Sequence, residues 1–362
     1  ESCGYLHPVD TNELIDVCRR CDAELPPGWS NLFRLQNVST VRRDRISSDE
    51  EERQRTGYEI ITGVRFAERE NKLSVVRTTV ASGGTELFNL SYGDTANIWR
   101  INLGWRRRTN NSQGFVLDIE RGYWSTEGNA DATPDQDDPL SKRTHRVIPF
   151  VEDSRNALLI EPCTPLSLEE MATLQAALKR AFQVVFQLEE NEIAAEPLPG
   201  LSKRRLLLFY ESAEGGAGVL RRLVDEPDTW RRVAAEALRL GHIDPDTGQP
   251  IATQSGEECE AACYECFLSY SNQPEHHRID RNLVQPHLRS LLDAELVAPV
   301  APQQPLGESV ESPTEQRFLD FLAAGGFARP DRHHLHVVQA DTWVDFAYSE
   351  KNTVVFVDGQ DR

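Results

Sequence analysis

The stretch Cys259-Glu260-Ala261-Ala262-Cys263-Tyr264-Glu265-Cys266 places three cysteines within eight residues. Free thiols rarely cluster without a metal, and thiolates are the soft ligands that tetrahedral Zn²⁺ prefers. We therefore predict that Cys259, Cys263 and Cys266 bind one Zn²⁺. For the fourth ligand the first choice is His276, because imidazole suits zinc and the residue follows shortly after the cysteines. The alternative is Cys163, although a lone cysteine is more often simply buried.

A second cysteine group lies near the start of the chain, where Cys18-Arg19-Arg20-Cys21 follows Cys3-Gly4. A zinc ribbon needs two C-x-x-C knuckles, and here the first knuckle shows only its second cysteine. Its missing partner would lie upstream of Glu1. We therefore expect a zinc site made of Cys3, Cys18, Cys21 and an upstream residue, in a segment cut from a longer protein. The alternative is a reduced C-x-x-C without metal.

The composition narrows the class of protein. Seven cysteines, six of them in two tight groups, favour metal sites in a reducing compartment over a disulfide framework. The sequence shows neither a signal peptide nor an apolar run of about 20 residues, so we expect a cytoplasmic protein with no membrane partner. A net charge of -19 argues against a protein coated in nucleic acid but allows a local basic groove. Three short basic clusters stand out, at residues 42–45, 106–108 and 203–205.

The patterns of apolar residues change along the chain. Short β-like runs such as Tyr58–Phe66 dominate the first part. Ser167-Leu168-Glu169-Glu170 then forms a capping box, which predicts the start of a long helix. A buried strand over Leu206–Tyr210 and a glycine turn over Glu214–Gly218 lead into a further helix. The stretch 297–313 is rich in Pro, Ala and Gln and reads as a linker.

These observations predict a multi-domain α+β fold. The expected order is a truncated zinc knuckle in residues 1–28, a β-rich accessory domain in 29–150, a zinc-bearing α/β domain in 151–296, the linker in 297–313 and the start of another α/β domain in 314–362.

The run Ala262–Gln273, followed by His276 and by Ile279-Asp280-Arg281, resembles the zinc-binding C-terminal domain of MrfA-type helicases. That domain recurs in bacterial anti-phage systems, in the Druantia helicase DruE and, as the alternative, in the DrmB subunit of DISARM. Residues 207–218, 32–45 and 99–106 fit the same family, so the resemblance extends over roughly residues 1–295. It implies that 151–296 is a MrfA-type domain of a DEAD/DEAH-type DNA helicase or translocase.

The resemblance also implies cofactors and partners. ATP and Mg²⁺ would belong to the motor of the parent helicase, yet no G-x-x-x-x-G-K-[ST] loop occurs here. The motor is therefore expected upstream or on another chain. This segment would hold the architecture through zinc, guide single-stranded or partly unwound DNA and contact other defence-system subunits. The alternatives are a protein-interaction scaffold and an independent metal-dependent nuclease.

The last fifty residues resemble the opening of a restriction-endonuclease-like domain. Its carboxylates would be Glu315, Asp345 and Asp358, since such nucleases use carboxylates to hold Mg²⁺ beside the scissile phosphate. Phe356 departs from the pattern, because a second strand carboxylate would be expected at its position. A degenerate or purely structural domain is therefore the other interpretation.

Two segments are candidates for contact with DNA. Trp105 with Arg106, Arg107 and Arg108 combines a ring face with positive charge, which suits stacking and phosphate pairing on a single strand. The glycine turn 214–218 could present backbone N–H groups to a phosphate. Its simpler interpretation is a tight turn that packs closely.

Overall fold

The computed structural model describes residues 2–7, 16–18, 20–35, 57–69, 72–106, 112–119, 122–125, 144–212, 218–253, 256, 259–297, 313–325, 327, 330, 332–337, 342–348 and 353–356. The chain divides into two compact units, residues 1–297 and 298–362, and each is described by itself. No described helix has both the length and the apolar composition needed to cross a membrane.

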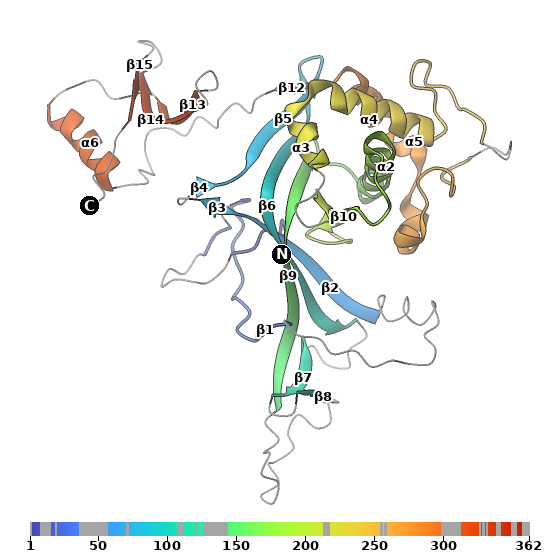
Figure 1. Ribbon diagram of the computed structural model, residues 1–362, viewed down its shortest axis with the longest axis horizontal. Helices are drawn as coiled ribbons and strands as arrows, with labels where there is room; N and C mark the ends of the chain where they lie inside the picture. Colours follow the sequence, from blue (N-terminus) through green and yellow to red (C-terminus); the bar gives the residue numbers. More distant parts are fainter. Residues whose placement is uncertain are drawn as a thin grey trace, which may run out of the picture. The chain divides into compact units, whose positions relative to one another are not determined.

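Two long antiparallel strands form the axis of the first unit. β6 (Thr85–Trp105) and β9 (Thr144–Pro162) pair from Phe88↔Pro162 to Ile101↔Phe150, with a bulge between Gly93 and Ala96. The bulge separates two halves of one described sheet of ten strands (Figure 1). One half contains β5 (Val76–Ser82), β10 (Ile193–Leu198), β11 (Leu206–Glu211) and β12 (Glu295–Val297). The other contains β1 (Leu32–Arg34), β2 (Tyr58–Phe66), β7 (Phe115–Asp118) and β8 (Tyr123–Ser125). A short pair, β3 (Glu68–Arg69) and β4 (Lys72–Leu73), stands outside this sheet.

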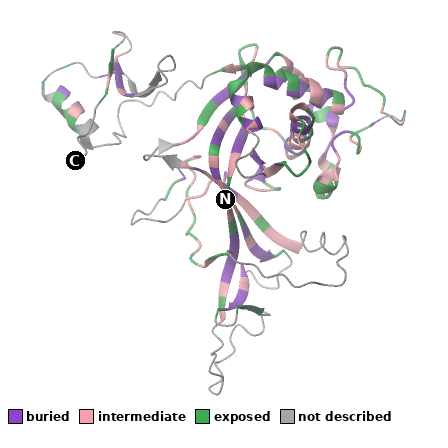
Figure 2. Ribbon diagram, viewed as in Figure 1, coloured by how far each residue is buried: buried purple, intermediate pink, exposed green. Residues whose placement is uncertain are grey.

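Around β11 the sheet is buried on both faces, which explains why this strand is an unbroken apolar run. Side chains alternate along a strand, so Leu158 and Ile160 of β9 pack into one cluster while Ala157 and Leu159 pack into the other. β11 alternates in the same way, and all six of its residues are buried. Buried residues, drawn in purple, are also seen along β9 in Figure 2.

Helices cover one of these faces. They are α2 (Leu168–Phe186), α3 (Val219–Asp225), α4 (Pro227–Leu240) and α5 (Arg281–Ser290), with the 3₁₀ helices η2 (Tyr270–Arg278) and η3 (Leu291–Asp293). The predicted capping box begins α2: Ser167 Oγ accepts from Glu170 N at 3.1 Å, and Glu170 Oε2 accepts from Ser167 N at 2.7 Å. Trp230 of α4 is fully buried in the centre of this layer and donates to the carbonyl of Leu223 at 2.8 Å.

The N-terminal segment lies along the other face. Val64 N donates to Gly4 O at 2.9 Å, and Leu6 N donates back to Val64 O at 3.1 Å, so residues 4–6 run beside β2. Gly63 makes room for this contact, because a Cβ there would lie 2.6 Å from the side chain of Leu6. Further along, Arg20 bonds Glu161 of β9 at 3.1 Å.

The fold is α+β, as predicted, but one expected boundary does not coincide with a break in the sheet. The boundary expected at residue 150 falls inside β9, and both halves of that strand belong to the same sheet. The β-rich part and the α/β part therefore share their central strands. The second unit contains α6 (Pro313–Ala324), β13 (Arg332–Val337), β14 (Thr342–Tyr348) and β15 (Thr353–Val355), the strands pairing antiparallel in that order.

Candidate metal centres

Four side chains gather near the C-terminal end of α4. The ligand atoms of His242, Cys259, Cys263 and Cys266 all lie within 4.8 Å of one another. His242 Nε2 lies 3.3 Å from Cys263 Sγ. A Zn²⁺ ion with Zn–S distances of about 2.3 Å sets a tetrahedral nitrogen about 3.5 Å from each sulfur. The donor set and the spacing therefore fit one zinc ion.

A tight turn presents the last two cysteines. Cys266 N and Leu268 N both donate to the carbonyl of Cys263, at 3.2 and 3.1 Å. Cys263 N lies 2.9 Å from Cys266 Sγ, so a backbone N–H points at that sulfur. A sulfur that accepts a backbone N–H is better able to carry the negative charge of a thiolate ligand. The turn thus spaces two sulfurs and supports one of them electrostatically.

His242 enters from the end of α4. Gly241 ends the helix, and His242 then takes a left-handed conformation with φ of 56°. This backbone state is several-fold enriched in His among non-glycine residues, and it turns the chain sharply. Burial lowers the pKa of His242, and nearby Arg281 lowers it further while Glu265 opposes the shift. The ring is therefore held neutral, the form in which imidazole binds zinc.

Arg281 holds the two halves of the group together. The side chain is only 5% exposed, at the start of α5. Its Nε donates to Cys259 O at 2.9 Å, and its Nη1 donates to Gly241 O and His242 O at 3.0 and 3.2 Å. One guanidinium thus fixes the backbone on both sides of the ligand set.

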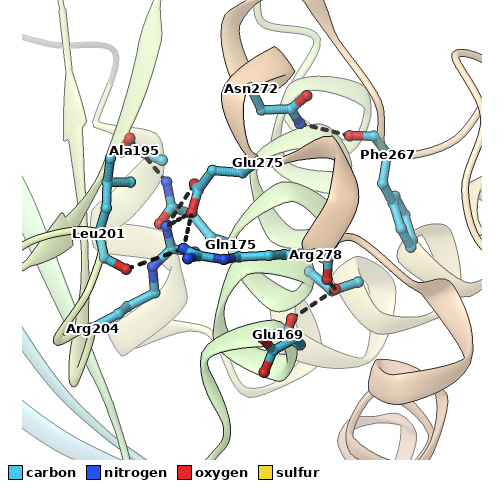
Figure 3. Close-up of polar contacts among 10 residues, drawn as sticks. Glu169, Gln175, Ala195, Leu201, Arg204, Phe267, Asn272, Glu275 and Arg278 are labelled. Carbon is cyan, nitrogen blue, oxygen red and sulfur yellow. Dashed lines mark hydrogen bonds and ion pairs between the residues drawn. The ribbon is translucent and has the colours of Figure 1, made fainter. Parts of the chain in front are cut away.

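The segment after the cysteines is fastened to the turn before β11 through Arg204, and to α2, where Thr173 Oγ1 donates to Arg278 O at 3.3 Å. Glu275 of η2 accepts two bonds from Arg204, at 2.8 and 2.7 Å, and Asn272 donates to Phe267 O at 2.8 Å (Figure 3). The Arg204 side chain is 1% exposed and that of Glu275 is 14% exposed. Removing one partner of such a buried pair costs about 3–5 kcal/mol, so η2 is firmly placed.

His276 does not join the metal group, and this corrects the expected fourth ligand. Its Nε2 lies 3.0 Å from Ser269 O and 2.9 Å from Asn272 Oδ1, because η2 turns the ring back toward its own first turn. Cys163, the alternative, directly follows β9, and its N–H donates to Leu87 O at 2.9 Å. It is also outside the metal group. His242 takes the position instead. The signal in the sequence was a histidine directly after a helix-ending glycine, upstream of the cysteines rather than downstream.

The N-terminal cysteines are also brought together. The sulfurs of Cys3, Cys18 and Cys21 lie within 4.8 Å of one another, and those of Cys3 and Cys18 are 3.7 Å apart. The latter distance is close to the roughly 3.8 Å edge of a tetrahedral zinc–thiolate site. Burial raises the pKa of the Cys3 thiol to about 12. Without an ion this group therefore holds a protonated thiol, which a metal would have to deprotonate.

The predicted DNA-contacting residues lie at the end of β6. Trp105 is 49% exposed and its ring lies 4.2 Å from that of Tyr58, while Arg106 Nε donates to Tyr58 O at 2.9 Å. The ring of Phe115 lies 5.9 Å from that of Tyr58, and the ring of Trp124 lies 5.9 Å from that of Phe115, measured between centroids. Arg107 and Arg108 lie outside the described residues. We call Tyr58, Trp105, Phe115 and Trp124 the aromatic row.

At Gly218, the described residue of the glycine turn, the backbone N–H is not available to a bound phosphate. Glu211 Oε2 accepts from Gly218 N and its Oε1 accepts from Leu220 N, both at 2.9 Å, so a carboxylate of the protein occupies the start of α3. Residues 213–217 lie outside the described part. Of the basic clusters, Arg204 is buried against Glu275 rather than in a groove, and residues 42–45 are not described.

The proposed nuclease carboxylates are only partly placed. Glu315 belongs to α6, Asp345 lies half-buried on β14, and Asp358 falls outside the described residues. The described residues of the second unit contain no group of three possible metal ligands. The nuclease interpretation thus stays a prediction.

Comparison with known proteins finds a family model that matches the part of the chain around the first of these metal groups. Residues 174–267 match the MrfA Zn-binding domain, and this range includes His242, Cys259, Cys263 and Cys266. No curated protein sequence matches the chain. Among solved structures, the crystal structure of the DUF1998 helicase MrfA bound to DNA aligns at 12% identity and a TM-score of 0.33. The alignment covers 65% of this chain and 26% of that protein.

Proposed function

Starting from a zinc-binding domain of the MrfA type in residues 174–267, we propose that this chain is an accessory segment of an ATP-dependent DNA helicase or translocase. The observation that carries the proposal is the group of His242 with Cys259, Cys263 and Cys266 inside that domain. The resemblance of the cysteine run to that of MrfA-type helicases supplies the helicase context. We further propose a role in bacterial anti-phage defence, alongside other subunits of such a system.

The zinc would serve structure rather than chemistry. Three thiolates and one imidazole complete the tetrahedral set, which leaves no open position for a reacting water. The ion would join the end of α4 to the cysteine turn, and Arg281 ties both to α5. ATP and Mg²⁺ would bind to a motor elsewhere, because no phosphate-cradling loop with a lysine occurs in this sequence.

The aromatic row is where we propose that a DNA strand passes. Trp105 and Trp124 are 49% and 50% exposed. A group of large apolar rings exposed together on a surface is typical of a binding site. Bases stack on such rings whatever their sequence, and adjacent arginines pair with the phosphates. The chain as a whole carries a charge of -19, so contact with a strand would depend on the local field of Arg106, Arg107 and Arg108.

Binding of fluorescent single-stranded DNA at several salt concentrations tests this proposal. Each phosphate contact on a single strand contributes about -0.7 to the slope of log K against log salt, so replacing Arg106, Arg107 and Arg108 by alanine should flatten the slope by about two units. Trp105→Ala should weaken binding by about 1–3 kcal/mol and leave the slope almost unchanged, because stacking releases no counterions.

A double alanine variant of Arg231 and Arg232, two exposed arginines of α4, controls for the loss of positive charge. It should bind like the parent. If the Trp105 and arginine variants also bind like the parent, the DNA path is wrong and a protein-interaction scaffold becomes the better account. Mg²⁺-dependent cleavage of the DNA in the same samples would instead indicate a nuclease.

A further inference from the structure

A histidine lies beside the N-terminal cysteine group, close to one of its sulfurs, while only the three sulfurs lie within 4.8 Å of one another. His7 Nε2 lies 3.2 Å from Cys18 Sγ, and the His7 ring packs edge-on against Tyr5, with centroids 5.2 Å apart. Zinc sites of the ribbon and finger type take their ligands as two close pairs separated by two to four residues. Cys3 and His7 are separated by three residues, and Cys18 and Cys21 by two.

The local backbone forms the turns that such pairs require. Gly4 has φ of 74°, which turns the chain directly after Cys3, and a Cβ at this position would lie 2.9 Å from the Leu198 side chain. In the second pair, Asp22 N donates to Cys18 O at 3.0 Å and Cys18 N donates to Ala23 O at 2.8 Å. The second pair is therefore a knuckle, whereas the chain bends at Gly4 after Cys3 and then runs beside β2 to His7.

Neither a disulfide nor simple packing accounts for this group of side chains. A disulfide needs sulfurs about 2.05 Å apart, whereas Cys3 and Cys18 are at 3.7 Å. Packing does not require three thiols at one point with an imidazole beside one of them, since neighbouring alkyl side chains would fill that space without burying polar atoms. We propose that Cys3, His7, Cys18 and Cys21 bind a second structural Zn²⁺, so that no ligand from upstream of Glu1 is needed. The ion would draw His7 Nε2 from Cys18 toward the other two sulfurs.

The position of this second site gives it a task. Cys3 and Cys18 are buried in the cluster on the face of the sheet away from the helices, together with Leu159, Leu208 and Tyr210. The zinc would thus fasten the described residues on either side of 8–15 to that face, in concert with the Arg20–Glu161 ion pair. It is independent of the group around His242, whose cysteines lie in the cluster on the helical face.

Zinc content of the purified chain tests the second site. The parent should hold two equivalents, and His7→Ala should hold one after dialysis against a weak chelator. His7→Cys should restore the second equivalent, since a thiolate can replace the imidazole. His277→Ala, an exposed histidine of η2, is the matched control and should keep both. Hydrogen exchange at the Val64 amide should quicken in His7→Ala alone, because that amide donates to Gly4 O.

Footprinting of the parent with diethyl pyrocarbonate supplies a measurement that needs no variant. His7 should be unreactive in the zinc-loaded chain and become reactive after chelation, whereas His277 should react in both states. The proposal is overturned if His7→Ala keeps two equivalents at the parent's affinity, or if His7 reacts equally with and without zinc. If the parent lacked only the zinc equivalent that depends on Cys263, the proposed function would lose its support. The second site would be unaffected by that result.

Discussion

At the scale of single residues, Arg281 has the largest expected effect on zinc without being a ligand. Its bonds to the carbonyls of Cys259, Gly241 and His242 orient both halves of the ligand set. Loss of such a supporting contact typically lowers metal affinity about 10–100-fold. We predict that Arg281→Gln weakens zinc binding by this factor in competition with a chromophoric chelator.

Arg231→Gln is the control, because Arg231 also donates to a carbonyl, that of Leu292 at 3.1 Å, but on the exposed side of α4. Equal affinity of the two variants would show that Arg281 only packs.

The same group shows how far single residues can be predicted. Cys259, Cys263 and Cys266 were predictable because three thiols so close in sequence have few other uses. His242 was not, because 16 residues separate it from Cys259 and only the folding of the chain closes that gap. The left-handed turn after α4 and the carbonyl contacts of Arg281 produce the approach, and both depend on long-range packing. A histidine nearer in sequence, His276, is used instead to stabilise η2.

At the scale of elements, the capping box makes the start of α2 sensitive to pH. Hydrogen bonds from the Ser167 backbone, then from its side chain and from His287, lower the pKa of Glu170 below its ordinary value. The stability from this carboxylate is therefore present above the pKa of the unfolded state and is lost as the pH falls through the lower folded value. We predict that the Glu170→Gln variant is less stable than the parent at neutral pH. Its urea unfolding midpoint should fall less than that of the parent as the pH is lowered into the mildly acidic range.

Glu169→Gln, at the neighbouring exposed position of the first turn, should keep the parent's pH dependence. An unchanged acid profile for Glu170→Gln would mean that other groups set the pH response.

Elements were easier to predict than their partners. The strand Tyr58–Phe66 and the capped helix after Ser167 have the predicted positions, because alternation, helical spacing and capping are local signals. The pairing of β6 with β9 joins Phe88 to Pro162 and cannot be inferred from local pattern, since nothing in either strand names the other. That pairing carries one sheet through residue 150, so a change from β-rich to helical composition did not mark a domain boundary.

At the scale of the whole first unit, one sheet has a metal-ligand group in the layer on each face. Cys259 and Cys266 belong to the cluster under the helices, and Cys3 and Cys18 to the cluster on the other side. A sheet with apolar side chains on both faces needs other parts of the chain to cover each face. On the face away from the helices, the described residues of the segment 2–25 form little regular secondary structure. Metal binding would supply the stability that such an irregular cover lacks.

The central claim is that the cysteine run binds zinc together with His242, and zinc content measured on Cys263→Ser tests it most directly. The variant should lose about one equivalent relative to the parent, and His242→Ala should lose the same equivalent or bind it far more weakly. Cys163→Ser and His276→Ala should keep the full content, because neither residue lies in the group. A Cys263→Ser chain with the zinc content of the parent would contradict the account.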